Sequence, residues 1–237
     1  MALPSPRAGP VVDLGCGSGE TLLALRERFG PELELVGVER DMPALDERLA
    51  ADARVRPVAA DLRAALPFAT GSIAAAVCHN TLECLPDKQA FLHEVARVLV
   101  AGGHLLLGHS DFDTIAFNAS DRDLTRRLVH AFADTQEAWM DAADGMIGRK
   151  LVAIGRGSPF ELVRTLGWVC IDTQPGGGGL ADSAIAGIAG ALRRDGHDEL
   201  VERFDGWLDD LRALAACGEF FFSVNDYAVL LRSPGAP

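Results

Sequence analysis

Apolar and polar positions along the chain follow two alternating patterns. Short apolar runs, several of them rich in valine, are typical of strands, and they alternate with segments whose apolar residues recur at helical spacing. This regular alternation predicts an α/β fold. Strands are predicted from Val11 and at residues 33–38, 55–60, 73–78, 104–108, 168–173 and 220–231. Helices are predicted at residues 19–29, 87–99, 158–166, 181–194 and 198–216, with another after Met42. Ser158 is the expected cap of the helix at 158–166, with Pro159 at its first position and Glu161 at its third.

Two stretches are longer than this alternation requires. Residues 111–157 contain an amphipathic helix spaced by Leu124, Leu128, Phe132 and Trp139, and residues 180–217 contain the last two helices. Insertions of this length in a compact domain are usually lids or binding walls. We therefore expect one domain over residues 1–237, with these two insertions as helical lids. Its core is expected at 10–110, 158–174 and 219–232.

The first predicted strand leads into a glycine-rich turn, Asp13-Leu14-Gly15-Cys16-Gly17-Ser18-Gly19-Glu20, followed by a helix. Glycines lack a Cβ, so a ligand can press against the backbone, and the helix start offers unpaired N–H groups. A dinucleotide-binding turn would have its third glycine at Glu20, whose carboxylate would repel a pyrophosphate. The turn therefore predicts a pocket for a nucleotide-like ligand, but Glu20 disfavours a nicotinamide dinucleotide as that ligand.

An acid follows the second predicted strand, in the sequence Glu39-Arg40-Asp41. In open α/β sheets, ligands bind beyond the carboxyl ends of the strands. Glu39 at that edge can accept hydrogen bonds from both hydroxyls of a ribose. The alternative interpretation is a solvated loop acid.

The turn with Gly15, Gly17 and Gly19 resembles motif I of the class I S-adenosylmethionine-dependent methyltransferases, and Glu39 matches this family's acid after the second strand. The segment from His79 to Asp87 resembles that of the ubiquinone/menaquinone-biosynthesis type of small-molecule methyltransferase. The chain departs from that pattern at two positions. Ala74 or its neighbours replace an acid early in the fourth strand, and Cys84 replaces a histidine shortly before the proline.

The resemblance implies a Rossmann-like sheet of seven mostly parallel strands, the last antiparallel, flanked by helices and with a helical lid. It implies S-adenosylmethionine as cofactor, S-adenosylhomocysteine as product, and no metal. Asp61 would accept from the adenine amine, and the backbone N–H of Leu62 would donate to a ring nitrogen. The expected cofactor-binding residues are Asp13, Gly15, Gly17, Glu39, Arg40, Met42, Asp61, Leu62, His79 and Asn80.

The implied reaction is transfer of the sulfonium methyl to a small-molecule acceptor, for which the protein has mainly to align the two partners and exclude water. A base is needed only if the acceptor enters protonated. His109, after the fifth strand, is the first candidate base, and His79 is the second. Either imidazole could instead serve only in packing or hydrogen bonding.

Charged residues after the fifth strand allow two interpretations. Asp111 and Asp113 could hold an amine substrate, and Arg149, Lys150 and Arg156 could bind a substrate anion. Solvated acids and a basic exposed face are the alternatives. His130 on the predicted lid helix is a further residue to test.

The overall charge and the cysteines narrow the class of protein. The net charge of −12 opposes binding to nucleic acid phosphates and anionic lipid surfaces. No apolar run approaches the ~20 residues of a membrane span. The five cysteines form no C-x-x-C pair and fit buried free thiols in a reducing compartment better than disulfides or zinc ligands. We therefore expect a cytoplasmic protein.

Other classes remain open at this stage. A protein that binds S-adenosylmethionine without methyl transfer, such as a rearrangement catalyst or a regulator, would keep the glycines and Glu39. A purely structural module would not require the combination of these glycines with Glu39. The helices near Trp207 could cover the pocket or form a homodimer contact.

Overall fold

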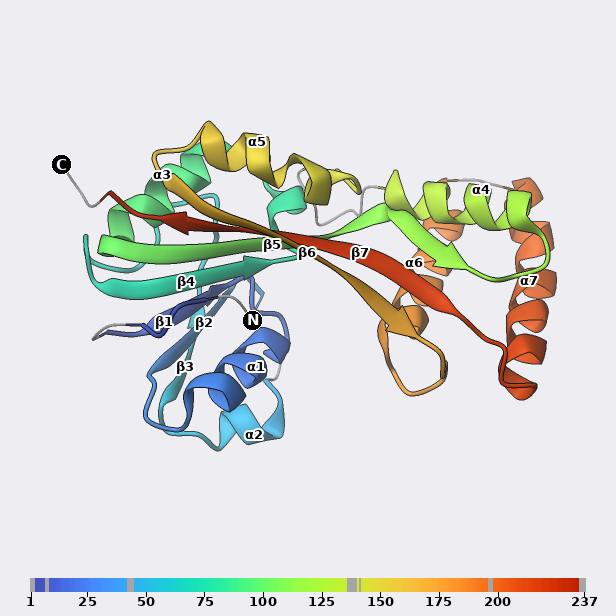
Figure 1. Ribbon diagram of the computed structural model, residues 1–237, viewed down its shortest axis with the longest axis horizontal. Coiled ribbons are helices and arrows are strands. Elements are labelled where there is room, and N and C mark those ends of the chain that lie inside the picture. The colour runs from blue at the N-terminus through green and yellow to red at the C-terminus, as the bar shows by residue number, and fades with distance from the viewer. Residues whose placement is uncertain are drawn as a thin grey trace. The chain divides into compact units, whose positions relative to one another are not determined.

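The computed structural model describes residues 3–6, 9–41, 45–135, 140, 142–195 and 198–234 (Figure 1). Its sheet has seven strands in the order β3-β2-β1-β4-β5-β7-β6. The strands are β1 (Val11–Leu14), β2 (Leu35–Glu39), β3 (Val55–Ala59), β4 (Ile73–His79), β5 (Leu99–Phe117), β6 (Glu161–Asp172) and β7 (Phe222–Arg232).

The first five strands are parallel. β1 pairs with β2 on one side and with β4 on the other, and β4 pairs in turn with β5. Every residue of β1 is buried, as expected for a central strand covered on both faces. Because the chain proceeds outward from β1 to β3 and then returns to β4, the strand order reverses between β1 and β4. Ligands of open α/β sheets bind at such a reversal.

The last strand, β7, runs antiparallel between β5 and β6 (Figure 1). Near the start of β5, the N–H of Ser233 donates to the carbonyl of Gly103 over 2.8 Å. Just past the end of β5, the N–H of Asn118 donates to the carbonyl of Phe221 over 3.3 Å. One strand therefore ends where its neighbour begins, which confirms the predicted seven-stranded sheet with an antiparallel last strand.

Seven α-helices accompany the sheet in the described part of the chain. They are α1 (Glu20–Phe29), α2 (Glu47–Ala50), α3 (Lys88–Val98), α4 (Arg122–Ala133), α5 (Leu151–Arg156), α6 (Leu180–Asp195) and α7 (Asp198–Ala216). Aspartates cap three of them, since Asp46 accepts from the N–H of Arg48, Asp87 from that of Ala90 and Asp121 from that of Leu124. None of the described helices combines the length and apolarity needed to cross a bilayer.

The chain divides into two compact units. The first unit comprises Met1–His109, Lys150–Leu166 and Tyr227–Pro237, and the second comprises Ser110–Arg149 and Gly167–Asp226. Each has its own apolar core. In the first unit α1 packs against the sheet through Leu22 and Leu25. In the second, Phe117 and Phe222 pack with Trp207 of α7, so the residues expected to form lids surround a separate core.

Two element predictions were wrong. The strand expected at 104–108 extends over all of β5, because its apolar positions continue through Ile115 and Phe117. The helix expected at 158–166 is instead part of β6. Ser158 resembled a helix cap, but its hydroxyl donates to the carbonyl of Gly155 at the end of α5, and extended backbone follows. The expected helices 181–194 and 198–216 are confirmed as α6 and α7.

The core of the second unit makes a stability prediction. Phe222 is 1 % exposed, whereas the neighbouring Phe221 is 38 % exposed. Truncation Phe222→Ala is expected to lower the free energy of unfolding by about 3–5 kcal/mol, because it removes buried aromatic contacts and leaves a cavity. The matched variant Phe221→Ala is expected to cost under about 1 kcal/mol. Urea unfolding of both variants provides the measurement, and equal losses would contradict this assignment of the core.

Candidate functional site

The glycine turn lies at the carboxyl end of β1, where the strand order reverses. Gly15 has φ 82° and Gly17 has φ 50°, a backbone region that side chains disfavour. A Cβ on Gly15 would overlap the side chain of Thr81, whereas a Cβ on Gly17 would meet nothing within 4 Å. Gly15 is therefore required by packing within the protein, and Gly17 borders open space.

Glu39 connects this turn to the end of β2. Its carboxylate accepts hydrogen bonds from the N–H of Gly17 at 3.2 Å and from the N–H of Arg40 at 2.8 Å. Each carboxylate oxygen has lone pairs beyond these two bonds, so hydroxyl groups of a ligand can still donate to it. The predicted juxtaposition of Glu39 with the glycine turn is thus present.

Asp13 is a buried acid within β1 and is 1 % exposed. Burial raises its pKa to about 7; the nearby His79 opposes that rise and Glu39 adds to it. Its Oδ2 has no hydrogen-bond partner among the residues the structure describes. A buried carboxyl oxygen without a partner among the described residues can be satisfied by a ligand group that is positively charged or that donates a hydrogen bond.

The acid after β3 is already engaged within its own loop. Asp61 accepts hydrogen bonds from the backbone N–H and the guanidinium of Arg63, and these bonds lower its pKa to about 2. Leu62 is buried at 7 % exposure. Two further expected cofactor residues follow β2. Arg40 pairs with Asp41 at 3.0 Å, and Met42 lies outside the described residues.

Beyond β4, His79 is half-buried and Asn80 is exposed. Asn80 has φ 50°, unusual for a residue with a side chain, and its N–H donates to the carbonyl of Gly108. The hydroxyl of Thr81 donates to the carbonyl of His79 at 3.1 Å. Sequence reasoning missed Thr81, whose contact with the glycine turn depends on the pairing of β1 with β4.

His109 was expected after the fifth strand but lies within β5, which continues to Phe117. It belongs to the first unit and is 0 % exposed. Its Nε2 is 3.6 Å from Oε1 of Glu83, which is 7 % exposed. Glu83 was also missed in the sequence, although an acid between Leu82 and Cys84 in a largely apolar run was an available signal. This separation is an ion-pair distance and is longer than a hydrogen bond.

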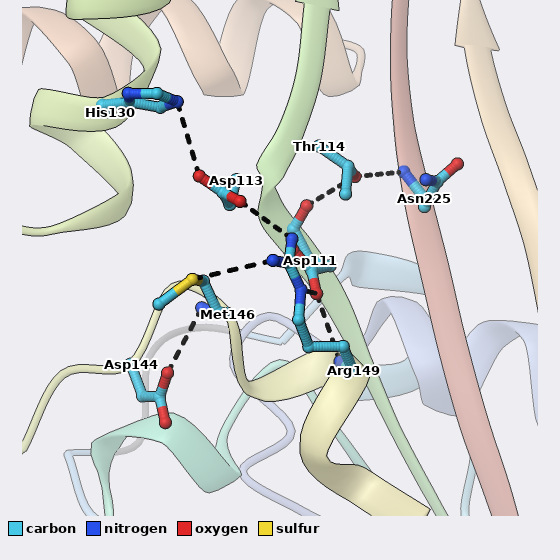
Figure 2. Close-up of polar contacts among 8 residues, drawn as sticks. All are labelled: Asp111, Asp113, Thr114, His130, Asp144, Met146, Arg149 and Asn225. Atoms are coloured by element: carbon cyan, nitrogen blue, oxygen red, sulfur yellow. Dashed lines mark hydrogen bonds and ion pairs between the residues drawn. The ribbon is translucent and has the colours of Figure 1, made fainter.

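Asp111 and Asp113, expected after the fifth strand, lie within β5, and they bind Arg149 within the second unit (Figure 2). Arg149 donates from Nε to Oδ2 and from Nη2 to Oδ1 of the fully buried Asp111, each over 2.6 Å. Arg149 also donates to Asp113 at 2.9 Å, and Asp113 lies 3.4 Å from Nε2 of His130. The carboxylates raise the pKa of Arg149, which secures its charge. The charges of Asp111 and Arg149 are thus paired with each other.

All five cysteines are free. Burial raises the pKa of Cys16 and of Cys84 to about 12, so these thiols remain protonated at neutral pH and are poor nucleophiles. Cys217 is exposed, against the expectation that all five would be buried. Among the described residues, no group of three or more His, Cys, Asp and Glu side chains is arranged to hold a metal ion.

The glycine turn and Glu39 lie within a segment that matches a known domain family. Residues 11–103, which run from β1 to the early part of β5, match the methyltransferase domain family. An uncharacterized 37.1 kDa protein in transposon TN4556 of Streptomyces fradiae is 26 % identical over 94 % of this chain and 62 % of its own length. A ubiquinone biosynthesis O-methyltransferase of Xanthomonas campestris is 36 % identical over 49 % of this chain and 48 % of its own. The chain thus spans between about half and three fifths of these relatives.

The fold has a solved counterpart. The YcgJ protein from Bacillus subtilis superposes with a TM-score of 0.58 at 16 % identity, over 98 % of this chain and 94 % of that one. This likeness concerns the fold alone. Residues 11–103 carry a methyltransferase domain, and for this part of the chain the predicted resemblance to the class I S-adenosylmethionine-dependent methyltransferases is confirmed.

Proposed function

We propose that the first unit binds S-adenosylmethionine and that the protein transfers its methyl group to a small-molecule acceptor. The observation that carries the proposal is the Glu39 carboxylate held against the N–H of Gly17, beside open space over the glycine turn. The Glu39 carboxylate can thus accept hydrogen bonds from ligand hydroxyl groups, and it lies next to a backbone that a ligand can approach closely.

The residues of the first unit fit the parts of this cofactor. Glu39 would accept from the ribose hydroxyls, and Gly17 would leave room for the ligand. Leu62 would offer its N–H and an apolar side chain to the adenine. Asp61 would accept from the adenine amine only while sharing its carboxylate with Arg63, whose three donors already contact it.

Asp13 fits the cationic amino group of the cofactor. Its Oδ2 lacks a partner among the described residues, and burial keeps its pKa near 7. A bound ammonium would stabilise the ionised carboxylate and lower that pKa.

S-adenosylmethionine supplies a methyl group on a sulfonium, and this carbon is transferred as the acceptor's lone pair forms the new bond and the sulfur keeps the old bonding pair. The protein aligns the acceptor and excludes water. His79 is half-buried and at the carboxyl end of β4, so it is the better placed of the two candidate histidines to take a proton from the acceptor. His109, fully buried beside Glu83, would act as a positioning residue.

A small acceptor is supported by the name of the Xanthomonas relative, which places that protein in ubiquinone biosynthesis. The net charge of −12 also disfavours nucleic acid as the acceptor. Cytoplasmic location and homodimer formation remain expectations drawn from the sequence.

The cofactor assignment is tested by titrating the protein with S-adenosylhomocysteine in a calorimeter. Gly17→Ala is expected to weaken binding at least about tenfold, because the added methyl enters the space proposed for the ligand. Gly71→Ala is the matched control, since Gly71 also has a positive φ, 63°, with nothing within 4 Å of its added Cβ. Both variants bear similar backbone strain, so equal affinity in the two would argue against a cofactor at Gly17.

The protonation of Asp13 makes the affinity depend on pH. Below its pKa of about 7 the carboxyl is neutral, and above that value it is charged and can pair with the ligand's ammonium. Affinity for S-adenosylhomocysteine is therefore expected to rise about tenfold between about pH 6 and about pH 8. Asp13→Asn should bind more weakly and without this rise.

The pH dependence of the unfolding free energy gives a second test of the raised pKa of Asp13. The native state keeps the Asp13 proton up to about pH 7, whereas an unfolded carboxyl loses it near the ordinary value of 3.8. The unliganded protein should therefore lose stability, relative to Asp13→Asn, as the pH rises between these two values. A difference between the two proteins that stays constant with pH would refute the raised pKa.

The roles of the histidines are separable once a screen of small acceptors, read by mass spectrometry for the gain of one CH₂ unit, has found a substrate. His79→Gln is expected to lower kcat about a hundredfold while affinity for S-adenosylhomocysteine stays within a fewfold. His109→Gln is expected mainly to lower the unfolding free energy, since it removes the buried partner of Glu83. The exposed His93→Gln serves as the control. Cofactor binding without any methylated product would favour the non-transferring alternative.

A further inference from the structure

The second unit contains a cavity of about 350 Å³ between α4 and the far half of β5. This volume is at the lower end of the range for small-ligand pockets. The strand contributes five consecutive residues, 113–117, and the helix contributes one face. The helix residues that line the cavity are Arg122, Thr125, Arg126, Val129 and His130.

The cavity lies along a stretch of β5 that lacks a second strand neighbour. The pairing of β4 with β5 ends at His79 and Gly108, so residues 110–117 of β5 have β7 as their only strand neighbour in the described sheet. Consecutive residues of a strand line a cavity together when the strand presents its edge, where backbone polar groups are available to a ligand.

The helix side of the cavity carries two arginines and a histidine. Arg122, Arg126 and His130 recur every four residues and therefore share one face of α4. Their side chains are 77 %, 62 % and 58 % exposed, and both arginines contact Asp123 only at 3.8 Å. Such long, exposed ion pairs contribute little, so both guanidinium groups remain available to an anion.

The acid in the cavity is already neutralised. Asp113 accepts from Nη2 of Arg149 at 2.9 Å and lies 3.4 Å from Nε2 of His130, as Figure 2 shows. Arg149 is in turn fixed by the buried Asp111. Asp113 therefore opposes an incoming anion less than a free carboxylate would, and the site keeps its positive character in a chain of net charge −12.

The remaining walls are apolar. Ile115 and Phe117 from β5 and Val129 from α4 are each less than a tenth exposed. Thr125 is also buried, and its hydroxyl accepts a hydrogen bond from Nε1 of Trp207 at 3.0 Å. The indole of Trp207 thus reaches a residue of the cavity wall and can report its occupancy.

We propose that this cavity is a second ligand site, for a small organic anion with a carboxylate or phosphate head and a compact apolar body. The head is held by Arg122 and Arg126, and the body packs on Ile115 and Val129. All of these residues belong to the second unit, so the site is separate from the residues proposed to bind the cofactor. Binding of an anion at this cavity requires neither the cofactor nor methyl transfer in the first unit.

The test uses naphthoate as the anionic probe and naphthamide as its neutral analogue, titrated in the calorimeter into the full chain. Naphthoate is expected to bind and naphthamide to bind at least about fivefold more weakly. The double variant Arg122→Gln with Arg126→Gln should weaken naphthoate binding about tenfold. Naphthyl phosphate in the same assay distinguishes a preference for a phosphate head from one for a carboxylate.

The control variant replaces two arginines that lie outside the cavity and are similarly exposed. Arg48 and Arg212 are 74 % and 72 % exposed, and each pairs with a nearby aspartate. Arg48→Gln with Arg212→Gln changes the net charge equally and should leave naphthoate affinity unchanged. The Trp207 indole signal in a ¹⁵N NMR spectrum should shift on adding naphthoate to the unmodified protein.

Three outcomes would overturn the proposal: no binding of naphthoate or naphthyl phosphate at millimolar concentration, equal losses in the two double variants, or binding that leaves the Trp207 signal in place. Affinity for S-adenosylhomocysteine should be the same in all of these proteins, so failure here and failure of the cofactor assignment are distinguishable.

Discussion

The first unit depends on a close approach between the backbone at the end of β1 and its neighbours. Gly15 leaves no room for a Cβ beside Thr81, and the N–H of Gly17 reaches the Glu39 carboxylate. Both contacts require parallel pairing of β1 with β2 and β4, which brings three separate strand ends to one edge. A single residue larger than glycine at position 15 would separate these ends, and the arrangement of the site would be lost.

Buried polar groups need hydrogen-bond partners, and this requirement is the second constraint on the protein. The buried aspartates of the two units differ in whether it is satisfied. In the first unit Asp13 is buried with one oxygen that lacks a partner among the described residues, a costly state that a ligand can relieve. In the second unit the buried Asp111 is paired through two bonds with Arg149. The unsatisfied acid belongs to the proposed cofactor site, and the satisfied one to the support of a different cavity.

The second unit combines parts of β5, β6 and β7 with the helices α4, α6 and α7. Its core is built around Phe117, Phe222 and Trp207, with aromatic rings 5.0–5.2 Å apart between Phe117 and each of the other two. An independent core of this kind explains why the insertions after β5 and before β7 are as long as they are. It also creates a surface on α4 whose chemistry is unlike that of the acidic chain as a whole.

The sequence by itself determined the sheet, the glycine turn and the place of Glu39, because these depend on local patterns: apolar runs, missing Cβ atoms and an acid at a strand end. It failed where a pattern was locally ambiguous, as at Ser158, whose capping signal belongs to the end of α5 and not to a new helix. Only the tertiary structure decided which polar groups meet. Thr81 meets Gly15, Glu83 meets His109 and Arg149 meets Asp111 through strand pairing and packing across many residues. No spacing along the chain records those contacts.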